Sequence, residues 1–146
     1  MTALRQYLEG MDLIISTYDD RDRSKCLEDY VKNASQYNLA VYSGAVSENH
    51  PLRKALLNCG VEQLHRFDAL NRFLVEQTIV GVSGSHGKTT TSWMLVSILK
   101  QFYGNCSWII GEAQIGENIL GYHSPEANHV IVEVDESDGM FYRMRS

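Results

Sequence analysis

The sequence is poor in the residues that build disulfide frames and metal-bound minidomains. Only three cysteines occur among 146 residues, at Cys26, Cys59 and Cys106, and no two of them form a CxxC pair. This wide spacing argues against a disulfide framework and against a cysteine-based zinc site. It favours free, buried thiols in a reducing compartment.

Long apolar runs and runs of positive charge are also missing. No apolar stretch approaches the roughly 18 residues needed to cross a bilayer, and no basic leader precedes an apolar core at the start. The formal net charge is −5 without a basic run, which argues against a nucleic-acid duplex as partner. We therefore expect a cytoplasmic protein that binds neither membranes nor nucleic acids.

The sequence does contain short apolar runs that alternate with segments of helical periodicity. Hydrophobic residues make up 44% of the chain and charged residues 21%, as in globular proteins. The alternation predicts an α/β fold with a mainly parallel sheet. The expected strands are 12–16, 39–43, 61–64, 78–82, 107–110 and 129–134.

Helices are expected between these strands, starting near residues 27, 48, 67 and 88. The last one follows a glycine-rich loop and runs from Lys88 to Phe102. An apolar stripe on it is assigned to the core, namely Met94, Leu95, Ile98, Leu99 and Phe102. A boundary between two α/β units is expected near Val75–Thr78.

Residues 81–91 carry the strongest chemical signal and read Gly-Val-Ser-Gly-Ser-His-Gly-Lys-Thr-Thr-Thr. A glycine-rich turn between a strand and a helix lets consecutive N–H groups converge on a phosphate at the positive end of the helix dipole. Lys88 can reach the outer phosphates, and the Thr89 hydroxyl can bind a magnesium ion. The residues expected to bind ATP are Gly84, Ser85, His86, Gly87, Lys88, Thr89 and Thr90.

The loop departs from the usual phosphate-loop pattern at Val82, where that pattern has glycine. Its glycines fall instead at every third residue, Gly81, Gly84 and Gly87. A purely structural turn is the alternative interpretation. We prefer a phosphate site because a structural turn has no need of a Lys-Thr pair at its exit.

A second cluster follows the strand expected at 129–134, where the chain reads Glu133-Val-Asp135-Glu136-Ser-Asp138. Ligand sites lie beyond the carboxyl ends of parallel strands, so these carboxylates lie beside Thr89 if the two strands are neighbours. Magnesium prefers such hard oxygen ligands. The spacing alone leaves the choice among these carboxylates open, and an acidic turn facing water is the alternative.

Together the loop Gly84–Thr91 and the acidic segment Glu133–Asp138 resemble the Mur ligase family. The runs Val41–Val46 and Asn49–Leu52 are also similar to it, and Ser85 stands where the family usually has threonine. The resemblance implies ATP and Mg²⁺ as cofactors, with Thr89 and Glu133 binding the metal. It also implies that Lys88 neutralises charge on the transferring phosphoryl group, and that His86 lies near the nucleotide.

The activity implied by the resemblance is an ATP-dependent ligation in peptidoglycan precursor synthesis. Within the family, the motifs are most similar to the branch that joins L-alanine to UDP-N-acetylmuramate through an acyl phosphate. Amide ligation in cell-wall peptide recycling and non-catalytic nucleotide binding are the alternatives. Each leaves the phosphate loop in place.

The chain lacks two parts that the resemblance leads one to expect. No glycine-rich UDP-sugar loop precedes Asp12, and the sequence stops at Ser146. We therefore expect a partial UDP-sugar-type Rossmann-like domain at 1–76 and the front of a P-loop ATPase domain at 77–146. Such a piece is expected to be inactive as a ligase when alone.

Overall fold

The chain forms two compact units in a computed structural model that describes residues 2–11, 13–112 and 118–134. One unit comprises residues 16–70. The other, here called the glycine-loop unit, combines the described parts of 1–15 and 71–146. The predicted domain division at 76/77 stays a prediction, because compactness alone does not define a family domain.

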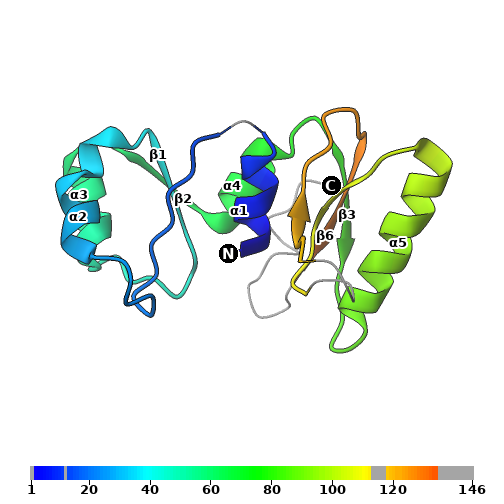
Figure 1. Ribbon diagram of the computed structural model, residues 1–146, viewed down its shortest axis with the longest axis horizontal. Helices are drawn as coiled ribbons and strands as arrows, with labels where there is room; N and C mark the ends of the chain where they lie inside the picture. The colour runs from blue at the N-terminus through cyan, green and yellow to red at the C-terminus, as the bar shows by residue number, and fades with distance from the viewer. Residues whose placement is uncertain (1, 12, 113–117, 135–146) are drawn as a thin grey trace. The chain divides into compact units, whose positions relative to one another are not determined.

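The 16–70 unit is built on a pair of parallel strands, β1 (Leu39–Tyr42) and β2 (Glu62–His65). Figure 1 shows the helices α2 (Leu27–Lys32) and α3 (Pro51–Asn58) beside this pair. A short 3-10 helix, η1 (Ala34–Gln36), follows α2. The unit's small core is formed by Ala34, Leu56 and Val61.

Helix α3 begins within three residues of the start that the sequence indicated. Pro51 occupies its first turn, and the main-chain N–H of Leu52 donates to Nδ1 of His50 at 3.2 Å, which caps the helix. Gly60 follows with φ of +73°, a conformation that glycine adopts without steric cost. The predicted strand and helix positions in this unit are confirmed to within a few residues.

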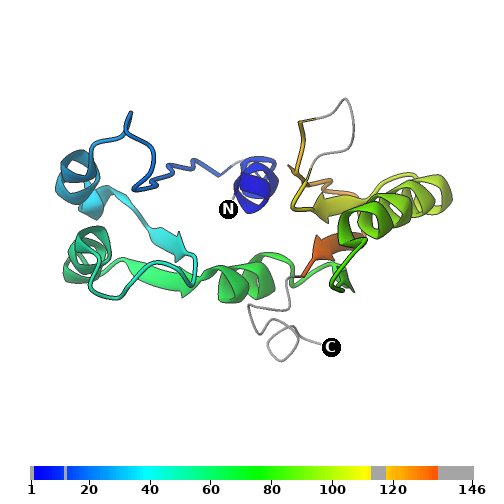
Figure 2. The same ribbon diagram turned by 90° about the horizontal axis from the view of Figure 1, so that it is seen from below.

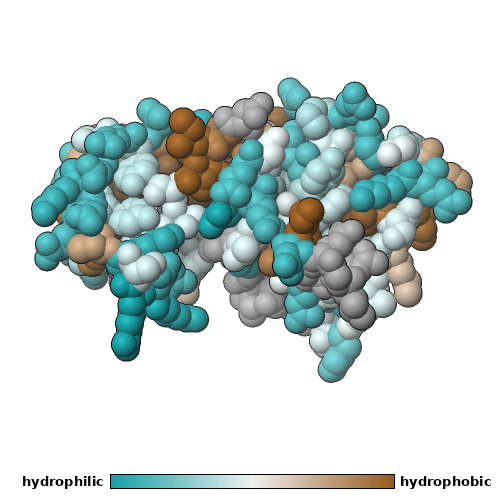
Figure 3. Space-filling model, in the orientation of Figure 1, coloured by the Kyte–Doolittle hydropathy of each residue, from teal (hydrophilic) through white to brown (hydrophobic). Residues whose placement is uncertain are grey.

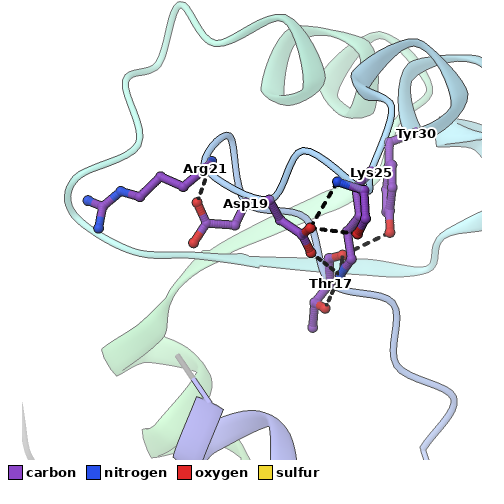
Figure 4. A network of polar contacts seen from close by, with 7 residues as sticks. Thr17, Asp19, Arg21, Lys25 and Tyr30 are labelled. Atoms are coloured by element: carbon purple, nitrogen blue, oxygen red, sulfur yellow. Dashed lines mark hydrogen bonds and ion pairs between the residues drawn. The ribbon is translucent and has the colours of Figure 1, made fainter.

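The irregular segment before α2 is held by its own polar groups (Figure 4). Lys25 Nζ donates to the hydroxyl of Thr17 at 2.8 Å and to its carbonyl, and the Tyr30 hydroxyl donates to the same carbonyl at 2.8 Å. Asp19 accepts from the main-chain N–H of Arg21 at 2.9 Å. The segment between Thr17 and Tyr30 is therefore ordered by local hydrogen bonds.

The glycine-loop unit contains a four-stranded sheet in the order β3-β6-β4-β5. Its strands are β3 (Thr78–Val82), β4 (Ser107–Ile109), β5 (Gly121–Tyr122) and β6 (His129–Glu133). Strand β6 pairs in parallel with both β3 and β4, and β5 joins β4 antiparallel. This confirms the predicted α/β fold with mainly parallel sheets.

Helix α5 (Lys88–Tyr103) packs along this sheet, as Figures 1 and 2 show. The core cluster between them has apolar side chains from α5 and from each of the three parallel strands. Its buried members are Val82, Trp93, Val96, Cys106, Trp108, Ile110 and Ile131.

A buried polar network lies at the amino ends of the parallel strands. The Tyr7 hydroxyl donates to Oε1 of Gln77 at 2.6 Å. The Gln77 amide nitrogen donates to the Ser107 hydroxyl at 3.1 Å and to the Ala127 carbonyl at 2.8 Å. Ser107 also accepts from the main-chain N–H of Ser124 at 3.0 Å. Tyr7 and Ser107 are fully buried, and this network supplies hydrogen-bond partners for their hydroxyls within the protein.

The sequence did not indicate two elements of this unit, α1 (Thr2–Glu9) and β5. Helix α1 is fixed by Gln6, whose Oε1 accepts from the main-chain N–H groups of Leu120 at 2.7 Å and Gly121 at 3.1 Å. Gly121 is required here, because a Cβ would collide with the carbonyl oxygen of Ala3. Both elements depend on contacts between residues more than 100 positions apart, which short-range patterns do not reveal.

The strand expected at 12–16 is wrong for its described part. Leu13 to Ser16 adopt no regular structure, and Ile14 is fully exposed. An apolar run becomes a strand only where a partner strand accepts its hydrogen bonds, and no strand among the described residues pairs with Leu13 to Ser16. Asp12 lies outside the described residues.

The core assignment of the α5 stripe is also partly wrong. Met94, Ile98 and Phe102 are exposed, Phe102 to 77%, whereas Trp93 and Val96 face the sheet. Apolar residues cover two adjoining faces of this helix, and the sheet covers only one. Part of the exposed face appears as brown atoms near α5 in Figure 3.

The three cysteines are free, as predicted, but only Cys106 is buried. Cys26 and Cys59 are exposed, which corrects the expectation of buried thiols. Across the described ranges, no helix combines the length and apolarity needed to cross a membrane.

Candidate functional site

The loop between β3 and α5 has the backbone conformation that its glycines permit. Gly84 has φ of +148° and Gly87 has φ of +75°. Gly87 is left-handed and stands immediately before the first residue of α5. A side chain at Gly87 would meet no neighbour within 4 Å, so glycine is needed there for its backbone freedom and not for space.

The start of α5 has the features of an anion site. Its cap residue is a glycine without a side-chain hydrogen bond, and its first turn has no acidic residue. The first helical bond runs from the Thr91 N–H to the Gly87 carbonyl at 3.0 Å. By helix geometry the N–H groups of Lys88, Thr89 and Thr90 have no intrahelical acceptor, and they lie at the positive end of the helix dipole.

The Lys88 side chain folds back across the loop. Its Nζ donates to the Gly84 carbonyl at 2.8 Å. An ammonium group has three N–H donors. The contact with Gly84 therefore fixes the position of the charge and leaves two donors for a bound anion.

Thr89 and Glu133 come from different elements and contact each other. The Thr89 hydroxyl donates to Oε1 of Glu133 at 3.1 Å. They meet because β3 and β6 are neighbouring parallel strands, with Val82 opposite Glu133 in register. The sequence predicted that a carboxylate of the acidic segment lies beside Thr89 if the two strands are neighbours. The structure shows that they are neighbours.

Glu133 is held from its other side by the segment after β4. The main-chain N–H of Gly111 donates to Oε2 of Glu133 at 2.7 Å. The next residue is also fixed, because the Trp93 indole N–H donates to the Glu112 carbonyl at 3.2 Å. Sequence reasoning missed Gly111 and Trp93. Gly111 acts through its main-chain N–H, which any residue except proline has, so its identity gives no signal. Trp93 lies on an apolar helix face, where a tryptophan indicates core packing.

The remaining predicted site residues lie on the loop or beyond the described chain. Ser85, His86 and Thr90 are exposed around the glycine turn. Asp135, Glu136 and Asp138 lie outside the described residues. Of the carboxylates considered for the cation, Glu133 is the one that the described structure brings to Thr89.

The residues present fit a magnesium ion with a bound nucleotide phosphate. Within the described ranges, no three His, Cys, Asp or Glu side chains gather into a metal cage. A hydroxyl and a carboxylate do converge, at 3.1 Å. Magnesium needs only one or two such protein oxygens when phosphate and water complete its ligands.

Comparison with known proteins gives sequence relatives but no match to a family model. The chain is 35% identical over 111 residues to the UDP-N-acetylmuramate–L-alanine ligase of Salinispora arenicola, which covers 76% of this chain and 22% of that enzyme. The enzyme of the same name from Carboxydothermus hydrogenoformans is 34% identical over 114 residues, with 76% and 24% covered. The chain thus spans about a quarter or less of the length of these curated relatives.

Solved structures confirm the fold. A Neisseria meningitides UDP-N-acetylmuramate:L-alanyl-γ-D-glutamyl-meso-diaminopimelate ligase matches 91% of this chain and 47% of its own, with a TM-score of 0.64 and 21% identity. A murein peptide ligase from Psychrobacter arcticus matches 80% of this chain and 29% of its own, with a TM-score of 0.56 and 24% identity. The chain is related in sequence to these ligases over three-quarters of its length and shares the fold of the solved structures. It therefore belongs to the Mur ligase family.

Proposed function

We propose that the glycine loop binds magnesium-ATP and that the chain serves ATP-dependent ligation in peptidoglycan precursor synthesis. The observation that carries the proposal is the contact between Thr89 and Glu133, at the end of the glycine loop. The proposal is also supported by the start of α5, whose first N–H groups lack intrahelical acceptors, and by the Lys88 ammonium group, which lies against the Gly84 carbonyl. The finer activity proposed is the joining of L-alanine to UDP-N-acetylmuramate in the cytoplasm.

Each site residue has a distinct role in this proposal. The N–H groups at the start of α5 and the Lys88 ammonium group bind phosphate oxygens. Thr89 and Glu133 supply oxygen ligands for magnesium, which when bound neutralises phosphate charge. His86 is exposed on the same loop and is proposed to lie near the nucleotide.

The proposed chemistry is phosphoryl transfer followed by amide formation. A carboxylate oxygen of UDP-N-acetylmuramate attacks the γ-phosphorus of ATP, and the bond to the β-phosphate oxygen breaks. The amine of L-alanine then attacks the acyl carbon, loses a proton and displaces inorganic phosphate. Lys88 acts by neutralising charge that spreads over the transferring group, because phosphoryl transfer depends on positioning and electrostatics.

Titration calorimetry with ATP, with and without Mg²⁺, tests the binding step. Glu133→Gln is expected to reduce the gain in ATP affinity on adding Mg²⁺ by about tenfold, because the amide loses the charge that attracts the cation. Glu136→Gln is the comparison variant and is expected to have a smaller effect. Equal effects would remove the assignment of Glu133 as the metal ligand.

Substrate turnover then separates the alternatives. ATP hydrolysis or ligation with UDP-N-acetylmuramate and L-alanine supports the proposed activity. Turnover only with L-alanyl-γ-D-glutamyl-meso-diaminopimelate, named in the Neisseria structure, would assign the chain to peptide recycling. Magnesium-ATP binding without turnover of either substrate supports a nucleotide-binding module, and absence of ATP binding by the folded chain would refute the proposal.

A further inference from the structure

Four residues, Thr89, Trp93, Gly111 and Glu112, surround the carboxylate of Glu133 and are linked to it directly or through one another. One oxygen accepts from the Thr89 hydroxyl, and the other accepts from the Gly111 N–H at 2.7 Å. The carbonyl of Glu112, the residue after Gly111, accepts from the indole of Trp93 at 3.2 Å. Trp93 and Thr89 are four residues apart on α5, so they lie on the same helix face and complete the ring.

We propose that Trp93 is a positioning residue for Glu133, acting through the main chain of Gly111 and Glu112. The cation role of Glu133 in this inference rests on the function proposed above. Its positioning does not, because the three hydrogen bonds that connect Trp93, Gly111 and Thr89 to Glu133 are present in the protein alone. Trp93 thus acts on the acidic ligand without touching the nucleotide or the metal.

The Gly111 amide is the direct link to the carboxylate. A hydrogen bond from an N–H to a charged oxygen is stronger than a neutral one, and 2.7 Å lies at the short end of its normal range. With Oε2 held by this bond, Oε1 is directed toward Thr89. A shift of the segment after β4 would therefore rotate the carboxylate away from its partner.

Trp93 is suited to fix that segment because its own ring is immobilised. It is 9% exposed in the core beneath α5, and its ring meets Trp108 edge to face with centroids 5.6 Å apart. A ring packed in this way holds its N–H in one direction. Outer partners of metal ligands act in the same manner on ligand orientation.

Glycine at position 111 allows the main chain to come close to the Glu133 carboxylate. A Cβ at this position would lie 3.2 Å from Oε2 of Glu133, closer than ordinary van der Waals contact. The absence of a side chain therefore lets the main chain approach the carboxylate. Adding a methyl group is expected to push the carboxylate off its present position.

The first test measures the contact without any ligand. In the folded chain, Trp93→Phe keeps an aromatic ring in the core but removes the indole N–H. The Gly111 amide proton resonance is expected to move upfield, in the direction that Glu133→Gln also produces, because both changes weaken the same hydrogen bond. Trp108→Phe is the matched control, because it keeps an aromatic ring against Trp93 but removes an indole N–H that donates to the Ile119 carbonyl at 3.4 Å and not to the segment that holds Glu133.

The second test measures Mg²⁺ affinity at a fixed ATP concentration. Trp93→Phe is expected to raise the apparent dissociation constant for Mg²⁺ about tenfold, with a smaller effect on magnesium-free ATP binding. Trp108→Phe is expected to leave both near wild type. Gly111→Ala provides a second variant if Trp93→Phe does not fold, and it is expected to raise the same constant.

The outcomes separate this inference from the proposed function. An unchanged Gly111 resonance and unchanged Mg²⁺ affinity in folded Trp93→Phe would overturn the positioning role. A shifted Gly111 resonance in a chain that binds no ATP would support the positioning contact and refute the nucleotide function instead. Equal effects from Trp93→Phe and Trp108→Phe would also overturn it, because loss of core packing would then account for both.

Discussion

The sheet of the glycine-loop unit has a cluster of polar residues at each end of its parallel strands. The two clusters differ in how many of their hydrogen-bond donors and acceptors have partners within the protein. At the amino end, Gln77 accepts from Tyr7 and donates to both Ser107 and Ala127. At the carboxyl end, the Lys88 ammonium group has three N–H donors and donates to the Gly84 carbonyl. The polar groups at the amino end hydrogen-bond to one another in a largely buried network. Those at the carboxyl end are partly exposed and keep hydrogen-bond donors for a ligand.

This difference separates structural from functional polarity within one sheet. Buried polar groups that hydrogen-bond to one another hold helices and strands together. Removing one of them leaves its partners short of a hydrogen bond. Polar groups that keep unused donors and acceptors can hydrogen-bond to a bound ligand. Substitutions at the amino end should therefore change stability alone, and substitutions at the carboxyl end should change binding alone.

The largest effect is expected for Gln77→Leu. The variant removes three hydrogen bonds, those of the Gln77 amide with the Tyr7 hydroxyl, the Ser107 hydroxyl and the Ala127 carbonyl. The free energy of unfolding is therefore expected to fall by about 3 kcal/mol. Urea unfolding measures the loss. A Gln77→Leu protein of wild-type stability would contradict the structural role of the amino end.

The next effect depends on pH and on Tyr7. Burial raises the pKa of Tyr7 from 10.0 to about 12, so the folded protein favours the neutral hydroxyl. The resulting stability is fully present below pH 10 and is lost as the pH rises from 10 to 12. It amounts to about 2 to 3 kcal/mol. Unfolding midpoints measured across this range should fall less steeply in Tyr7→Phe, and parallel curves would argue against the effect.

Lys88→Ala is expected to weaken ATP binding by about 2 kcal/mol, or roughly thirtyfold, because a charge-assisted phosphate contact is lost. Calorimetric titration measures this change. The unfolding free energy should remain near the wild-type value, since Lys88 gives up a single partly buried hydrogen bond. Unchanged ATP affinity would refute the phosphate-loop assignment.

The smallest effect is expected for Ser92→Ala in α5. Ser92 is fully buried, and its hydroxyl has no hydrogen-bond partner in the described structure. Alanine removes an unsatisfied group and is the better helix former, so stability is expected to rise by about 0.5 to 1 kcal/mol. Thermal unfolding measures it. A clear loss of stability would reveal a polar role for this hydroxyl.

Much of the carboxyl end was predictable from the sequence, because strand, glycine loop and helix follow one another locally. Strand β3 and helix α5 lie where the periodicity indicated. The contact of Thr89 with Glu133 spans 44 positions, yet it follows from two motifs that each end a parallel strand.

The amino end was not predictable from local patterns. Its network joins Tyr7 to Gln77 across 70 positions, and neither residue belongs to a recognisable motif. The exposed face of α5 was misjudged for a related reason. Periodicity identifies apolar faces, but only the neighbouring elements determine which face they cover.

The position of β6 between β3 and β4 has a consequence for how the unit assembles. The strand that carries Glu133 is the last of the four in the chain, yet it lies between two earlier strands that do not pair directly. Until residues 129–133 insert, β3 and β4 lack a parallel partner and Thr89 lacks its carboxylate. Closing such non-local pairings is slow. During synthesis, therefore, the sheet and the candidate cation site both remain incomplete until residues 129–133 have been made and inserted.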